Sequence, residues 1–134
     1  MSFALDYFFF ASLSACGVLQ IAASYSLLKG IYLLPNRLIT SLLGLVLTLG
    51  AFIWFFASEP RNVPDTGPGL DGNQQATLFV AASMAAVLFT LVISSVVNWR
   101  MRPKDGRYLP GLSALRHASF LHALPATIRS LRAR

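Results

Sequence analysis

The segment Asn98-Trp99-Arg100-Met101-Arg102-Pro103-Lys104 separates two parts of the chain that differ in composition. Long apolar runs without a charged side chain come before it, and an arginine-rich tail follows it. Lysine and arginine are enriched at the cytoplasmic ends of membrane-spanning helices, and tryptophan is enriched at the membrane–water interface. This segment therefore predicts the point at which the chain leaves a membrane.

The overall composition also favours a membrane protein. Of the 134 residues, 55% are hydrophobic and 12% are charged, whereas soluble domains carry about 25% charged residues. The net charge of +6 arises mainly after Trp99, because residues 100–134 contain eight of the eleven lysines and arginines and one acidic residue. The single cysteine, Cys16, cannot form a disulfide within the chain, and we expect it to be a small packing residue.

Three charge-free runs define the predicted helices. Each is long enough to cross a hydrocarbon core of about 30 Å at about 1.5 Å per residue, and they cover residues 7–28, 38–58 and 76–99. The short link 29–37 makes the first two helices antiparallel neighbours, with Gly30 suited to end one helix. The longer loop 59–75 is rich in proline and glycine, which excludes a continuous helix.

The sequence therefore predicts an all-α membrane protein with two parts. Residues 1–99 form three transmembrane helices in an antiparallel bundle, and residues 100–134 form a basic, partly interfacial helical tail. The first run does not resemble a signal peptide, because no lysine or arginine precedes it. A weaker alternative is a lipid-attachment motif, since Leu13-Ser14-Ala15-Cys16 resembles one.

Small and polar side chains predict the faces on which the helices pack. In the second run, Thr40, Gly44, Thr48 and Ala51 recur at spacings of four, four and three residues, which places them on one face. The amide of Gln20 is costly to expose to lipid, so we expect it to hydrogen-bond to another helix. The complete set of predicted helix-packing residues is Gln20, Thr40, Gly44, Thr48, Ala51, Ala81, Ala85 and Asn98.

Two basic segments predict the same orientation. Lys29 and Arg37 lie in the link between the first two runs, and a cluster of arginines follows the third run. With three spans, the link and the tail lie on one side of the membrane, and the positive-inside rule makes that side the cytoplasm. We expect a bacterial inner membrane, with the N-terminus and the loop 59–75 outside.

The tail is predicted to be helical from Gly111 onwards, with a division at Pro125. After the division, apolar residues share one face and arginines surround it, which is typical of an interfacial helix. We expect contact with anionic lipid on the inner side for Arg100, Arg102, Lys104, Arg107, Arg129 and Arg132. Apolar residues before the division do not share one face, and we expect a partner protein to cover Leu112, Leu115, Phe120 and Leu121.

The candidate chemistry outside the membrane is sparse. Asp65 and Asp71 flank a glycine-rich turn without the ligand spacing of a calcium loop, and His117 and His122 lack further ligands for zinc. Charged side chains at membrane depth mark proton and ion pathways, and the three runs contain none. We expect no catalytic residue, cofactor or metal, and no nucleic acid, because a membrane-tethered tail meets anionic lipid first.

Three functions are compatible with these patterns. The first is a non-catalytic accessory or structural subunit of a larger energy-transducing or transport complex in the membrane, because three helices cannot cover all their small and polar faces among themselves. The second is a self-assembling pore or carrier, with Gln20, Thr40, Thr48 and Asn98 between protomers. The third is a small membrane enzyme or lipid-handling protein that uses the aspartates or histidines named above.

Overall fold

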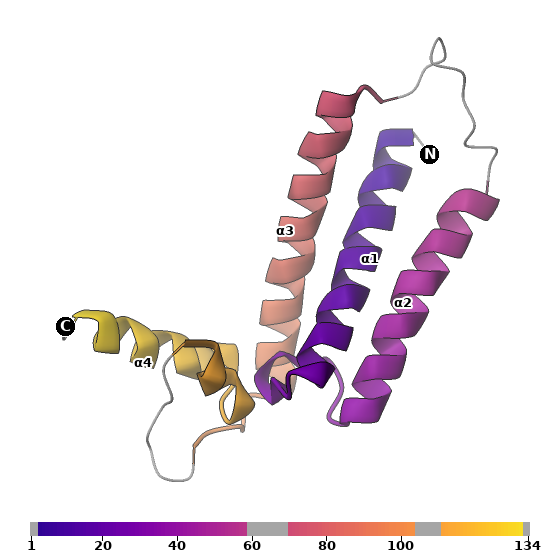
Figure 1. Ribbon diagram of the computed structural model, residues 1–134. Helices are drawn as coiled ribbons and strands as arrows, with labels where there is room; N and C mark the ends of the chain where they lie inside the picture. The colour runs from indigo at the N-terminus through magenta and orange to yellow at the C-terminus, as the bar shows by residue number, and fades with distance from the viewer. Residues whose placement is uncertain (1–2, 59–69, 104–110, 133–134) are drawn as a thin grey trace.

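The computed structural model describes residues 3–58, 70–103 and 111–132, and every regular element in these ranges is helical. Three helices are long and apolar enough to cross a membrane: α1 (Phe3–Tyr25), α2 (Arg37–Ala57) and α3 (Gly72–Val97). The 3₁₀-helices η1 (Lys29–Ile31) and η2 (Gly111–Arg116) and the helix α4 (Phe120–Arg132) complete the described chain (Figure 1). The prediction of an all-helical protein with three candidate membrane spans is confirmed.

The helix α1 lies between α2 and α3 (Figure 1). It packs along both of them, whereas α2 and α3 scarcely contact each other. The helices α1 and α3 run in the same direction, and α2 runs in the opposite one (Figure 1). The elements η1, η2 and α4 gather at the end of the molecule where α1 ends (Figure 1). The arrangement is more open than a bundle in which each helix contacts both others.

The ends of α1 differ from the predicted run. The helix begins at Phe3, so that Asp6 lies buried in its first turn, where a carboxylate suits the helix dipole. It ends at Tyr25, and Leu27 adopts a left-handed conformation with φ of 58°. The Leu28 amide then donates to the Ala23 carbonyl at 3.0 Å, a Schellman-type ending. The predicted ending at Gly30 is therefore wrong.

Local capping explains where α2 and α3 begin. The Asn36 side chain accepts a hydrogen bond from the Leu38 amide at 2.9 Å, which starts α2. Asp71 and Gln74 form a capping box at the start of α3, with the Asp71 carboxylate 2.7 Å from the Gln74 amide. This cap lengthens α3 by four residues relative to the predicted span, which began at residue 76.

The helices α1 and α2 cross at two glycines. A Cβ atom at Gly17 would lie 2.6 Å from the Gly44 carbonyl oxygen, and a Cβ atom at Gly44 would lie 2.6 Å from the Gly17 carbonyl oxygen. Only glycine permits backbones to approach this closely in a membrane. Towards the other end of α1, the ring of Phe10 stacks on that of Phe55 with 4.5 Å between their centroids, which adds aromatic contact to the same interface.

The tail forms two short helical elements, η2 and α4. The division predicted at Pro125 is wrong, because α4 continues through Pro125. The break instead falls at residues 117–119, before Phe120. A small apolar cluster holds the break and the first turn of α4 against the link after α1, and it comprises Leu28, Ile31, Ala114, Leu115, Ala118, Phe120 and Ala123.

Candidate functional site

The predicted packing stripe of α2 lies on its buried side. Gly44 and Thr48 lie directly against Gly17 of α1, and Thr40 and Ala51 are buried on the same face. The Thr40 hydroxyl donates to the Leu34 carbonyl at 2.9 Å, and the Thr48 hydroxyl donates to the Gly44 carbonyl at 2.9 Å. Both hydroxyls therefore have partners within the chain, and the stripe leaves little space between α1 and α2.

Gln20 is fully buried, but its partners differ from the expected ones. Its Nε2 donates to the Ile31 carbonyl at 3.4 Å, and its Oε1 accepts from the Leu33 amide at 3.0 Å. Both partners belong to the link between α1 and α2, so the prediction of a bond to another helix is wrong. The amide instead satisfies backbone groups at the end of η1 and just after it, which lie outside the spanning helices.

The packing face of α3 is rotated by one residue from the predicted one. Ala82 and Ala86 are buried, whereas the predicted Ala81 is exposed and Ala85 is half-buried. The buried face continues at spacings of four through Thr90, Ser94 and Asn98. On α1, the Ser12 hydroxyl donates to the Ala82 carbonyl at 3.4 Å, and Cys16 Sγ lies 3.7 Å from Thr90 Oγ1.

The polar groups of α3 explain this rotation. Ser94 is fully buried, and the Asn98 amide donates both to the Ser94 carbonyl at 2.9 Å and to the Tyr32 carbonyl at 2.8 Å. Tyr32 is itself buried, and its hydroxyl donates to the Ser24 carbonyl at 3.4 Å. Because these groups need partners inside the protein, they bring the Ala82 face of α3 against α1.

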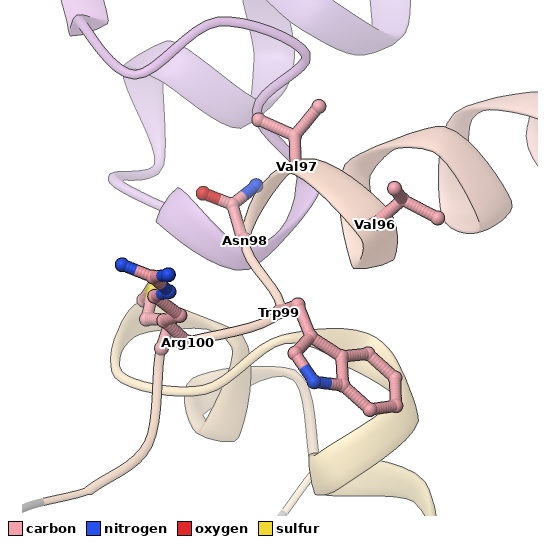
Figure 2. Close-up of a pocket in the computed structure, with 6 residues that line it drawn as sticks. Val96, Val97, Asn98, Trp99 and Arg100 are labelled. Carbon is pink, nitrogen blue, oxygen red and sulfur yellow. The ribbon is translucent and has the colours of Figure 1, made fainter.

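The end of α3 forms a shallow hollow of about 480 Å³ (Figure 2). The Asn98 amide points from it towards the link after α1, while the Trp99 ring extends beside the tail (Figure 2). The Trp99 ring centroid lies 5.2 Å from that of His122. The segment from Asn98 to Arg102 therefore connects the spans, the link and the tail.

The polar residues assigned to a pore have partners inside the chain. Gln20 and Thr40 are fully buried, and Asn98 donates to two backbone carbonyls. Thr48 is half-buried, and its hydroxyl donates within its own helix. In the described part of the chain, the polar groups of these four side chains therefore have partners within the same molecule.

The main candidate site is a groove above α1, where α2 and α3 diverge. It encloses about 540 Å³ and is almost entirely apolar. Its walls contain Thr48 and Phe52 from α2, and Phe79, Ser83 and Val87 from α3. The lining residues contributed by α1 are Tyr7, Phe10, Ala11, Ser14, Ala15, Val18 and Leu19. We call this feature the α2–α3 groove.

The floor of the α2–α3 groove has the pattern of a helix-packing surface. Tyr7, Ala11, Ser14 and Val18 recur at spacings of four, three and four, which is the repeat of helices that pack side by side. The small residue Ala15 lies beside them and permits close approach. The Ser14 hydroxyl is buried and has no hydrogen-bond partner within the described chain. The sequence indicated Ser14 only as part of a candidate lipid-attachment motif and did not indicate this face.

The tail is fixed to the spans through His122. The Arg102 Nε donates to His122 Nε2 at 3.1 Å, and His122 Nδ1 lies 2.6 Å from the Ser119 hydroxyl. The two ring nitrogens of His122 thus pair with side chains from both ends of the intervening segment, Arg102 and Ser119. The Ser119 amide also donates to the Met101 carbonyl at 3.3 Å. His122 thus joins the start of α4 to the segment after α3.

The four predicted partner-contact residues fall into two pairs. Leu115 is buried in the tail cluster and Phe120 packs against it, so the protein itself covers them. Leu112 and Leu121 are exposed. The irregular apolar pattern of this region therefore arises partly from contact with the link, where Gly30 lies against the carbonyl groups of Leu115 and Ala118.

The predicted membrane-surface arginines that are described, Arg100, Arg102, Arg129 and Arg132, are exposed. Lys104 and Arg107 lie outside the described residues, as does Asp65. Asp71 takes part in the capping box of α3, and His117 is exposed. Within the described ranges, no group of three or more histidine, cysteine or acidic side chains is placed to hold a metal ion.

Comparisons with protein-family models, with curated proteins and with solved structures find no match for this chain. The physical features that bear on function are therefore the α2–α3 groove and the tail attached to the end of the spans.

Proposed function

We propose that this protein is a non-catalytic accessory subunit of a larger membrane complex, and that the α2–α3 groove holds a transmembrane helix of another subunit. The observation that carries the proposal is the groove floor, where a helix-packing repeat of small and apolar side chains lies open between α2 and α3. A neighbouring helix packs on such a repeat by placing its own side chains between those of the floor.

A different subunit suits the groove better than a second copy. A second copy would enter with the outer face of its own α2 or α3. The outer face of α2 carries large side chains such as Leu42, Leu49 and Ile53, which suit contact with lipid. If a helix of a different subunit fills the groove, no further copy of this chain is added at that contact.

The proposed setting in the membrane follows the charge pattern. The three helices form an antiparallel bundle in a bacterial inner membrane, with the start of α1 outside and the tail in the cytoplasm. Lys29 and Arg37 beside α1 and α2 and Arg100 beside α3 lie at the end of the molecule that carries the tail (Figure 1). The tail residue Leu112 is exposed and suits contact with the same partner.

Site-specific cross-linking in the native membrane tests the proposal. In a Cys16→Ser background, Val18→Cys places a thiol on the groove floor, whereas Ala22→Cys places one on α1 outside the groove. We expect position 18, but not position 22, to cross-link to a peptide from a transmembrane helix of a different polypeptide. Mass spectrometry identifies the linked peptide.

Two outcomes would overturn the proposal. One is a cross-link from position 18 to a second copy of this chain, which supports self-assembly. The other is the absence of any protein cross-link at position 18 together with migration of the extracted protein as a lone small species in a mild detergent.

A further inference from the structure

The position of α4 is fixed relative to the end of the spans. Its first turn is attached by the hydrogen bond from Ser119 to Met101 and by the contacts of His122 with Trp99 and Arg102. Met101 lies only four residues beyond the end of α3. The helix α4 then extends sideways away from α3 and the other spans, and not along the span axes (Figure 1). It therefore lies at the level where a membrane meets water.

One face of α4 carries a continuous apolar stripe. Leu121, Leu124, Ile128 and Leu131 recur at spacings of three, four and three, and each is more than 40% exposed. The side of α4 that packs against the protein contains Ala123, about 100° around the helix from Leu124, and Phe120 lies between that side and the stripe. An exposed apolar stripe on a helix at this level is typical of an interfacial helix.

Positive charge borders the apolar stripe. At about 100° per residue, Arg129 and Arg132 fall on the side of the stripe away from Ala123. Both arginines are exposed, and residues 111–134 contain no acidic side chain. Long arginine side chains can extend to lipid phosphates while the apolar face enters the leaflet. The charge complements an anionic lipid surface.

Pro125 also indicates the depth of α4. Proline has no amide hydrogen, so the Leu121 carbonyl cannot accept the usual bond from residue 125. A carbonyl without that bond is costly in the hydrocarbon core but readily hydrated among lipid headgroups. This feature suits a helix that lies at the interface and does not insert deeply.

We infer that α4 is an interfacial helix that binds the anionic lipid leaflet at this end of the spans. Leu121, Leu124, Ile128 and Leu131 enter the upper acyl region, and Arg129 and Arg132 bind lipid phosphates. The occupant of the stripe is lipid and not a protein, and the inference does not depend on what fills the α2–α3 groove.

Depth measurements on the full-length protein test the inference. In a Cys16→Ser background, Ile128→Cys places a fluorescent probe on the stripe, and Ala126→Cys places one on another face of α4. The protein is reconstituted in nanodiscs of phosphatidylcholine alone or with phosphatidylglycerol. We expect spin-labelled lipid to quench the probe at 128, and an aqueous quencher to act more strongly on the probe at 126.

Substitution of the arginines tests the role of charge. We expect Arg129→Gln with Arg132→Gln to lower the ratio of lipid-shielded to exposed probe at 128 by more than about tenfold in anionic nanodiscs. Arg116→Gln is the control, because Arg116 is exposed on η2 away from the stripe. The inference fails if both probes are equally accessible to the aqueous quencher. It also fails if shielding is independent of anionic lipid or requires a partner protein.

Discussion

Gly17 and Gly44 show how the absence of two side chains sets the distance between two membrane helices. In lipid, exclusion of water does not drive helices together, so van der Waals contact between closely packed surfaces holds them. A Cβ atom at Gly17 would meet the carbonyl oxygen of Gly44 at 2.6 Å and the hydroxyl of Thr48 more closely still. The contacts at this crossing therefore depend on glycine.

We predict that Gly17→Ala destabilises the protein by about 1–3 kcal/mol, because the new methyl group pushes α1 and α2 apart. Gly50→Ala is the matched control, since a Cβ atom at Gly50 meets nothing within 4 Å. Alanine in place of an exposed helical glycine stabilises a helix by up to about 1 kcal/mol. Unfolding in detergent micelles, followed by circular dichroism, measures both. Equal effects of the two substitutions would contradict the proposed role of Gly17.

The sequence predicted part of this residue-level packing. Spacing alone identified the face of α2 that contains Gly44, because small residues recur there at helical intervals. It did not single out Gly17 among the other small residues of α1. The burial of Gln20 was foreseeable from the cost of an unpaired amide in lipid. Its partners were not, because they belong to an irregular link whose path depends on tertiary contacts.

At the scale of an element, α3 illustrates how polar groups choose between neighbouring faces. Its alanines form two equivalent pairs in the sequence, and either pair could face α1. The structure buries Ala82 and Ala86, which lie on the face that continues through Thr90 to Asn98. The spacing of four from Ala82 to Asn98 was visible in the sequence and would have selected the correct pair.

Ala82→Leu and Ala81→Leu form a matched pair that tests this orientation of α3. Ala82 is fully buried against α1, so a leucine there overfills the interface, and we expect a loss of about 1–3 kcal/mol. Ala81 is exposed, and leucine there should change stability by less than about 0.5 kcal/mol. Thermal unfolding in micelles distinguishes the two. If Ala81→Leu is instead the more destabilising substitution, the face of α3 that contains Ala81 and Ala85 packs against α1, as the sequence predicted.

The tail elements were harder to predict, because contacts distant in sequence determine them. Pro125 suggested a division, yet α4 continues through it. Phe120 and Ala123 pack in the tail cluster, and Ser119 bonds to both Met101 and His122. These contacts stabilise the first turn of α4 and offset the missing hydrogen bond at Pro125. The helix propensities of the tail residues give no information about these tertiary contacts.

At the scale of the whole molecule, the link after α1 connects the spans to the tail. Its segment near Ile31 binds Gln20 of α1, and Tyr32 accepts from Asn98 of α3. Its glycine, Gly30, lies against the tail. Because both basic segments border this region, the charge pattern predicted that the link and the tail share one side of the membrane. Their direct contact, however, was not predictable from charge.

Gly30 is the point at which this connection can be broken with one methyl group. A Cβ atom at Gly30 would lie 2.9 Å from the Leu115 carbonyl oxygen and closer still to that of Ala118. We predict that Gly30→Ala detaches the tail without unfolding the spans. Amide hydrogen exchange in residues 111–132 should then accelerate by about tenfold or more, the equivalent of about 1.4 kcal/mol.

Gly72→Ala is the control for this experiment, because a Cβ atom there meets nothing within 4 Å and Gly72 begins α3 at the opposite end of the molecule (Figure 1). It should leave exchange in residues 111–132 unchanged, and exchange in α1 and α2 should remain slow in both variants. If Gly30→Ala leaves the tail fully protected, the contact between the link and η2 does not hold it. In that case, lipid and the His122 side chain alone would hold α4 at the interface. His122 would still be fixed by its hydrogen bonds with Arg102 and Ser119.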